Sequence, residues 1–400
     1  MNKHQETYRG YRSFDYLEAD TDYTAFPLAP QIDRVPAFEH PLPPEDDTRA
    51  QRLLEETLMI SLHDHLGCFP EPITETKAYV REGRQTTAFE GLAQSHWDCI
   101  FENFMDGICQ IHSKRGWKWS EILHDLGIRL CDLDHQDFVF LCRGVDDIVR
   151  AHEQGRIALV ASIEGAAPIE NELERIEILY GFGVRAMGIT YSESNGLGSG
   201  LKETTDGGLT SFGSRVVERM NKVGMLVDCS HCGDKTTLDV IEASDKPIAL
   251  THIGARALWD TNRMAPDDVM KACADKGGVI GIEAAPHTTI TANNTRHNLD
   301  AYMEHFEYVK DLVGLDHVAF GPDTLYGDHV GLHGVYKSSL SIKEANQTDY
   351  ERVDYVEGVE NPTEASVNIV RWLVGHGYSD DAIASVVGGN ALRLLREVWE

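Results

Sequence analysis

Six side chains suited to metal binding or proton transfer stand at or near the ends of apolar segments in this 400-residue chain; they are His63, His65, Glu164, His231, His252 and Asp323. His63 and His65 are two residues apart, so in a strand both imidazoles point the same way, whereas Asp64 faces the opposite layer. Both imidazoles can therefore reach one metal ion. Imidazole suits zinc, and a carboxylate such as Glu164 can bridge two ions. His231 and His252 would then complete the coordination of a second ion.

A lone histidine at a strand end is more often a satisfied polar residue than a ligand. Four histidines and two carboxylates at corresponding strand ends are far less expected by chance. In a parallel barrel the carboxyl ends of the strands converge on one face. The sequence therefore predicts a metal site on that face.

Three side chains are candidates for contact with a substrate. Asp323, after Gly321-Pro322, could take a proton from a metal-bound water and pass it to a leaving group, or it could be a structural anchor. The hydroxyl of Tyr191 could face a developing oxyanion, or Tyr191 could be an ordinary rim residue. Arg263 could hold a substrate carboxylate as a fork, or it could form a surface salt bridge.

These positions require strands that alternate with helices. Short apolar or β-branched segments predict seven strands, at Leu58–Leu62, Ile157–Ile163, Val184–Thr190, Met225–Cys229, Pro247–Thr251, Gly278–Ala284 and His317–Gly321. A less clear eighth strand is expected near Cys99–Cys109. Helices are predicted at Ser214–Val223, Pro266–Lys276 and Asn361–His376, the last with Thr363 as its cap. The order is typical of an α/β protein with a (β/α)₈ TIM barrel.

A doubly wound open sheet is the alternative fold, but no G-x-G-x-x-G motif follows a first strand. Residues 1–50 contain six prolines between 27 and 44 and little apolar periodicity, which predicts an extended arm that wraps the domain or a neighbouring subunit. Residues 51–400 are expected to form a single barrel domain.

The net charge of −29 makes nucleic acid and anionic membranes poor partners. The N-terminus lacks a signal-like apolar core, and no stretch of about 18 apolar residues occurs, so a soluble cytoplasmic protein is expected. The eight cysteines are scattered and mostly lie in apolar segments, which indicates reduced core thiols. Cys229 and Cys232 have C-x-x-C spacing but end a core strand, so core packing is favoured over a redox or zinc role.

Four segments resemble the membrane dipeptidases, that is renal dipeptidase and its bacterial relatives. They read GGLTSFGSRVVERMNKVGMLVDCSH at 207–231, KPIALTHIGAR at 246–256, RMAPDDVMKACADKGG at 263–278 and GYSDDAIASVVGGNALRLLREV at 377–398. The resemblance covers roughly residues 55–400, with the motifs in the same order. It implies a barrel of the metallo-dependent hydrolase type and a homodimer.

The resemblance also implies roles for individual residues. His63 and the residue at 65 would bind one zinc ion, His231 and His252 the other, and Glu164 would bridge them. Asp323 matches the aspartate that handles the proton, and Arg263 the arginine that holds the substrate carboxylate. The implied reaction is attack of a metal-bridged hydroxide on a dipeptide amide.

The chain departs from this pattern at three positions. The first motif is His63-Asp64-His65 where the family has His-x-Asp, so the site loses one negative charge and resembles the wider amidohydrolase group. Tyr191 stands where the family has a histidine near the substrate carbonyl. Asp323-Thr-Leu-Tyr-Gly327 replaces Asp-Phe-Asp-Gly. Metal binding is still expected with these three changes, but the identity of the substrate becomes an open question.

Three functions follow from these observations. The first is hydrolysis of a dipeptide or an N-acyl amino acid at two divalent metal ions. The second keeps the metals but takes a lactam, a lactone or a pathway-specific amide, because His65 and Tyr191 alter the pocket. The third, a non-catalytic barrel used for binding or assembly, is disfavoured because the site residues are intact.

Overall fold

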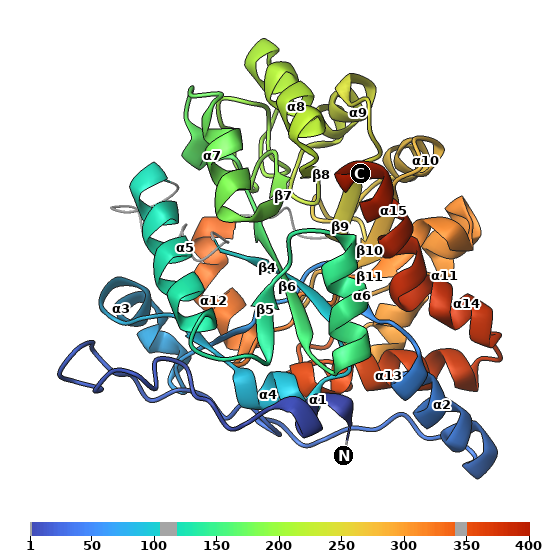
Figure 1. Cartoon of the computed structure of the whole chain (residues 1–400). Coiled ribbons are helices and arrows are strands. Elements are labelled where there is room, and N and C mark those ends of the chain that lie inside the picture. The colour runs from blue at the N-terminus through green and yellow to red at the C-terminus, as the bar shows by residue number, and fades with distance from the viewer. Residues whose placement is uncertain (1, 105–117, 341–349) are drawn as a thin grey trace.

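Eight parallel strands form a nearly closed barrel in this computed structural model, which describes residues 2–104, 118–340 and 350–400 (Figure 1). Their order is β1 (Ile60–Ser61), β4 (Cys99–Asn103), β6 (Ile157–Ile163), β7 (Val184–Gly188), β8 (Leu226–Asp228), β9 (Ala249–Ile253), β10 (Val279–Ile282) and β11 (Val318–Phe320). The amide of Leu62 donates to the carbonyl of Phe320 at 2.9 Å and links the first strand to the last. The predicted barrel fold is therefore confirmed.

Six of the seven clear strand predictions contain an observed strand, whereas the prediction at Pro247–Thr251 overlaps β9 (Ala249–Ile253), which extends two residues further and includes His252. The less certain eighth corresponds to β4, and residues 105–109 of that prediction lie outside the described part of the chain. One further strand, β5 (Val139–Leu141), pairs with β6 beside the barrel path and was not predicted from the sequence. Only three residues long and only partly buried, it leaves almost no periodic signal.

Helices surround the strands on the outside (Figure 1). They are α3 (Thr76–Glu82), α4 (Phe89–Gln94), α5 (Trp119–Leu133), α6 (Val145–Gln154), α7 (Arg175–Phe182), α8 (Ser211–Val223), α9 (Asp234–Ala243), α10 (Asp267–Asp275), α11 (Leu299–Val313), α12 (His329–Leu340), α13 (Pro362–Gly375), α14 (Asp380–Ala384) and α15 (Asn390–Trp399). A small antiparallel pair, β2 (Gly67–Cys68) with β3 (Thr86–Thr87), follows the first barrel strand, and α3 lies in the connection between the two. Within the described residues no helix has the length and apolar character needed to span a bilayer.

Helix α8 shows how the sequence sets these boundaries. Thr210 accepts a hydrogen bond from the amide of Gly213 at 2.9 Å and caps the first turn. Val216, Val217 and Met220 are buried on its inner face. The helix ends at Gly224, which adopts φ +77°, a left-handed conformation that glycine reaches without a Cβ clash. The predicted end of this helix at Val223 is confirmed.

The predicted cap of α13 is wrong. Thr363 lies inside the helix, which begins at Pro362 with Asn361 in the cap position. Proline suits the first helical position because its missing N–H would have no partner there. The side chain of Asn361 accepts from the amide of Val35 at 3.2 Å and makes no capping bond to the helix.

The N-terminal segment runs along the lower side of its own barrel in Figure 1. Most of it is irregular, and two short stretches, α1 (Lys3–Thr7) and α2 (Pro44–Glu56), are helical. Buried carboxylates of the barrel hold its beginning: Asp98 contacts Lys3 and His4, and Asp132 accepts from the amide of Phe14 at 2.7 Å. Farther along, Phe38 and His40 bond to side chains of α13.

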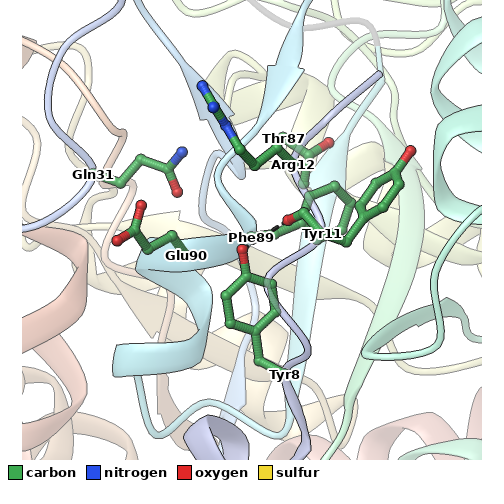
Figure 2. Close-up of a pocket in the computed structure, with 7 residues that line it drawn as sticks. All are labelled: Tyr8, Tyr11, Arg12, Gln31, Thr87, Phe89 and Glu90. Carbon is green, nitrogen blue, oxygen red and sulfur yellow. Dashed lines mark hydrogen bonds between the residues drawn. The ribbon is translucent and has the colours of Figure 1, made fainter. Parts of the chain in front are cut away.

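The arm and barrel also enclose a cavity of about 260 Å³, shown in Figure 2. It is lined by Tyr8, Tyr11, Arg12, Gln31, Thr87, Phe89 and Glu90. The ring of Tyr11 packs edge-on against Phe89 with centroids 5.3 Å apart. None of the six candidate metal-site residues lines this cavity.

Buried apolar side chains form two sets, one on the inner side of the barrel wall and one on its outer side. Along β6, Ala158 and Val160 belong to one set, whereas Leu159 and Ala161 belong to the other, as strand alternation requires. The first set continues into Leu394 and Leu395 of α15. Burial of each such leucine stabilises the fold by roughly 1.5–3 kcal/mol, so this core holds the strand ends in fixed positions.

Among the described residues the cysteines form no disulfide, and Cys109 lies outside that part of the chain. Cys229 and Cys232 are buried, and burial raises the pKa of the Cys229 thiol well above its ordinary value. Only Cys131 is exposed among these thiols.

Candidate metal centre

The structure brings together all six side chains predicted to lie at the metal site. Oε1 of Glu164 lies 3.1 Å from Nε2 of His231, 3.4 Å from Nε2 of His252 and 3.9 Å from Nε2 of His63. Oδ1 of Asp323 lies 3.2 Å from Nε2 of His63 and 3.1 Å from Nε2 of His65. Two adjacent sets of donors result, one around Glu164 and one around Asp323, and His63 belongs to both.

The strand ends aim these side chains. His63 and His65 follow β1 on the same side of the chain, and Asp64 between them turns into the protein. There Asp64 accepts from the hydroxyl of Ser61 at 2.5 Å and from the amide and hydroxyl of Thr324, both at 2.8 Å. Burial raises the pKa of Asp64 to about 6. The alternation expected from the sequence therefore separates the two histidines from the aspartate.

Asp323 has φ +59°, an uncommon left-handed conformation for a residue other than glycine. Its amide donates to the carbonyl of His63 at 3.0 Å, which ties the end of β11 to the segment after β1. Such a conformation costs on the order of 1 kcal/mol and persists only where surrounding contacts hold it. This backbone conformation places Oδ1 of Asp323 3.2 Å from Nε2 of His63 and 3.1 Å from Nε2 of His65.

A second layer of residues orients the ligand rings. Nδ1 of His63 lies 3.0 Å from the side-chain amide of Asn103, Nδ1 of His252 lies 2.8 Å from Oγ1 of Thr251, and Nδ1 of His231 lies 3.2 Å from Oγ of Ser192. Each contact leaves Nε2 directed at the centre, as in metal-binding histidines. Nε2 of His63 is buried and faces the carboxylates of Asp323 and Glu164. This donor set fits divalent metal ions.

The directions of the pKa shifts at the site are consistent with a donor set for divalent metal ions. Burial, and next the positive charge of Arg263, lower the pKa of His231 well below its ordinary value. Burial, followed by His63 and Arg263, does the same for His252. Burial opposes ionisation of Asp323, but hydrogen bonds from His63 and His65 hold the pKa of this carboxyl well below its usual range. These shifts favour a neutral imidazole at His231 and His252 and an ionised carboxylate at Asp323, the protonation states that suit metal binding.

Tyr191 and Arg263 both lie at the centre, in different environments. The ring of Tyr191 stacks on His231 with centroids 4.3 Å apart and an interplanar angle of 24°. Arg263 is only 3% exposed, makes an ion pair with Glu283 and donates to two backbone carbonyls. Their roles toward a substrate stay predictions.

Sequence reasoning missed Glu283, which is fully buried and whose carboxylate lies within 4.8 Å of donor atoms of His252 and Asp323. Burial raises its pKa to about 7, whereas the charge of Arg263 lowers it. The predicted strand Gly278–Ala284 ran past this residue, while β10 ends at Ile282. With the correct boundary, the strand-end rule that identified Glu164 would also have identified Glu283.

A parallel barrel whose strand ends carry histidines and carboxylates in metal-binding sets is typical of metal-dependent enzymes. Residues 48–344 match the membrane dipeptidase family, peptidase family M19, and the chain belongs to that family. The family resemblance expected from the sequence is therefore confirmed.

Individual relatives are distant. An uncharacterized protein in the pqqA 5′ region of Klebsiella pneumoniae is 27% identical over 274 residues, covering 65% of this chain and 89% of the relative. Dipeptidase 3 of Rattus norvegicus is 24% identical over 249 residues, covering 61% of this chain but only 45% of the relative. The structure of an amidohydrolase from Pseudomonas aeruginosa shares the fold with a TM-score of 0.71 at 23% identity, covering 88% of this chain and 99% of that one.

Proposed function

We propose that this chain hydrolyses the amide bond of a dipeptide or an N-acyl amino acid at a centre of two divalent metal ions. One observation carries the proposal: Glu164 lies against His63, His231 and His252, while Asp323 lies against His63 and His65. Two donor sets this close suit a pair of ions with a shared carboxylate. The imidazole-rich donors favour zinc.

In this proposal His63 and His65 would hold one ion, His231 and His252 the other, and Glu164 both. The ions would supply a hydroxide nucleophile at neutral pH and polarise the substrate carbonyl. Membership of the dipeptidase family supports an amide as the bond that is cleaved. The predicted homodimer and cytoplasmic location rest on the sequence and the family alone.

The side chains of this protein would do the remaining work. Asp323, charged and within hydrogen-bond reach of two histidines, would accept a proton from the attacking water and deliver it to the leaving nitrogen. Tyr191, which stacks on His231, would donate a hydrogen bond from its hydroxyl to the developing oxyanion. The neighbouring rings and buried strand ends would exclude bulk water, which strengthens these contacts.

Metal analysis and hydrolysis assays of a His231→Ala variant test the proposal. The wild type should bind about two zinc ions and cleave several dipeptides, whereas the variant should lose an ion and its activity. His135→Ala is a matched control, because His135 is exposed and its ring stacks on Tyr16. A fully active His231→Ala protein would refute the proposal. Turnover of lactams or lactones without any dipeptide cleavage would support the alternative substrate class.

A further inference from the structure

Four histidines that belong to neither donor set lie beside the metal centre. His287 and His297 stand in the segment between β10 and α11, and His329 and His333 stand in the first two turns of α12. Both segments follow the carboxyl ends of barrel strands, so they lie on the face that carries the metal centre. The rings of His329 and His333 are edge-on to each other, with centroids 4.9 Å apart. Burial is the main cause of a lowered pKa at His297, and neighbouring histidines, the other three included, add to it, so the four rings form one histidine cluster.

His297 holds a buried hydrogen-bond donor without an acceptor. It is 0% exposed, and its Nδ1 accepts from the backbone amide of His287 at 3.1 Å. The lowered pKa of His297 favours the neutral ring, and a neutral imidazole whose Nδ1 accepts a hydrogen bond carries its proton on Nε2. Within the described part of the chain no acceptor reaches that Nε2–H. Buried polar atoms are almost always paired, so this donor calls for an acceptor from a ligand.

The backbone at His287 adopts an uncommon conformation where it makes this contact. His287 has φ +60°, in the left-handed region that residues other than glycine seldom adopt. Its amide donates to His297, and its own Nδ1 is buried with no hydrogen-bond partner among the described residues. Backbone of this kind is concentrated at ligand sites. The segment between β10 and α11 thus presents two imidazoles as well as connecting a strand to a helix.

The histidine cluster lies near the two charged groups that are predicted to act on the leaving half of a substrate. Burial lowers the pKa of His329 and of His333, and the charge of Asp323 opposes that shift in both. The charge of Arg263 lowers the pKa of His333 further. In the proposed reaction Asp323 protonates the leaving nitrogen, and the sequence predicts that Arg263 holds the substrate carboxylate. In a dipeptide both groups belong to the C-terminal residue, so the side chain of that residue would face the cluster.

A third metal ion does not suit this cluster. An imidazole binds a metal through an unprotonated ring nitrogen, whereas Nδ1 of His297 is engaged by a backbone amide and Nε2 bears the proton. Among the described residues, the sets whose donor atoms converge closely enough for an ion include none of these four histidines. The rings can instead offer hydrogen bonds to an oxygen atom.

We propose that the histidine cluster is the binding site for the side chain of the C-terminal residue of the substrate, and that Nε2–H of His297 donates to a carboxylate or carboxamide oxygen there. The assignment to a dipeptide rests on the proposed amide hydrolysis. The unpaired donor of His297 does not depend on it. Glutamate and glutamine supply such an oxygen, whereas norleucine has a side chain of similar length without one.

The test compares dipeptides of alanine followed by glutamate, glutamine or norleucine, with the second residue in the L and in the D configuration. The wild type should show a kcat/KM at least about 10-fold higher for the glutamate or the glutamine dipeptide than for the norleucine dipeptide, as expected for one hydrogen bond to a buried donor. Whichever of the two is preferred identifies the oxygen as that of a carboxylate or of a carboxamide.

Two substitutions of His297 separate its two ring nitrogens. His297→Asn can replace the acceptor Nδ1 but does not reach the position of Nε2, so the preference should fall to within about twofold of none. His297→Gln can place an amide N–H near the position of Nε2 and should keep more of the preference than the asparagine variant. Zinc content should equal that of the wild type in both, because His297 is not a proposed ligand.

His317→Asn is the matched control. His317 precedes β11 at the opposite end of the barrel, and its Nδ1 lies 2.9 Å from the carbonyl of Gly278. This substitution should leave the preference unchanged. Circular dichroism establishes that each variant is folded, and the wild-type preference and the glutamine variant decide the matter if His297→Asn does not fold.

Equal kcat/KM for the three dipeptides in the wild type, or an equal fall for all three in His297→Asn, would overturn the proposal and make His297 a structural residue. Phosphinate analogues of the same dipeptides, with a phosphinate in place of the scissile amide, separate this outcome from the proposed function. Isothermal titration calorimetry measures their binding without turnover. If the wild type cleaves none of the dipeptides, amide hydrolysis fails for these substrates, and the dependence of analogue affinity on His297 then decides the binding site alone.

Discussion

His231 and Glu164 meet at the end of the barrel, with Nε2 of the histidine 3.1 Å from Oε1 of the carboxylate. They follow different strands, β8 and β6, and neither lies near the other in sequence. The same oxygen of Glu164 also faces His252 and His63. One carboxylate therefore stands between histidines that the proposal assigns to different ions.

Substitution of Glu164 by glutamine should disrupt the whole centre. The amide keeps the size of the side chain but loses the charge that a bridging ligand needs. We expect the zinc content to fall from about two ions to one or fewer and kcat to fall by at least about 10³-fold, which corresponds to roughly 4 kcal/mol. Glu170→Gln, an exposed position on the same segment, is the control. A variant with two ions and normal kcat would contradict the bridging role.

Replacement of Asp323 by asparagine should separate proton transfer from metal binding. The side chain keeps its shape and its place between His63 and His65 but can no longer accept a proton. We expect kcat to fall by about 10²- to 10⁴-fold, with little change in KM and with both ions retained. Metal analysis and steady-state kinetics check this, with the exposed Asp311→Asn as control. Loss of an ion would instead identify Asp323 as a ligand.

Replacement of Tyr191 by phenylalanine removes the hydroxyl and preserves the ring that stacks on His231. If the hydroxyl stabilises the oxyanion, kcat should fall by about 10²-fold while KM changes little, as for loss of one oxyanion donor. Zinc content should stay normal because the ring still packs on the ligand. Steady-state kinetics on dipeptides check this. An unchanged kcat would mean that Tyr191 only packs against His231 and does not stabilise the oxyanion.

The position of the site could be predicted because it depends on strand geometry. His63 and His65 alternate with Asp64, and every other candidate ligand lies at or just beyond a strand end, so a barrel must gather them on one face. The environment of each side chain could not be predicted in the same way. The burial of Arg263 and its pairing with Glu283 arise from contacts among three strand ends, and no local pattern records them.

The N-terminal arm is a second feature whose side-chain contacts could not be predicted from the sequence. Its prolines predicted an irregular segment, but its docking depends on Asp98 and Asp132, which lie far along the chain and look like ordinary surface acids in the sequence. Both carboxylates are almost completely buried. Burial of that kind becomes visible only once the arm is placed on the barrel.

Substitution of Asp98 by asparagine should loosen this docking. The carboxylate of Asp98 contacts Lys3 at 2.6 Å, His152 at 2.9 Å and His4 at 3.3 Å, and it accepts from the amide of Met59 at 3.0 Å. Removing its charge leaves Lys3 without its counter-ion. We expect the free energy of unfolding in urea at pH 7 to fall by about 3 kcal/mol, whereas Asp245→Asn on the exposed surface should have little effect.

The Asp98→Asn variant also tests how the free energy of unfolding depends on pH. Burial opposes ionisation of Asp98, but hydrogen bonds from His152 and His4 and the charge of Lys3 hold the pKa of the folded-state carboxyl well below its ordinary value. The unfolded carboxyl has a pKa of about 3.9. A group with a lowered folded-state pKa stabilises the fold above the unfolded-state pKa, and this contribution is lost as the pH falls toward the folded-state pKa. The difference in unfolding free energy between wild type and Asp98→Asn should therefore be present at pH 5 and narrow below about pH 4. Urea titrations at several pH values measure it, and a difference that widened below pH 4 would contradict the stabilising role of the ionised carboxylate.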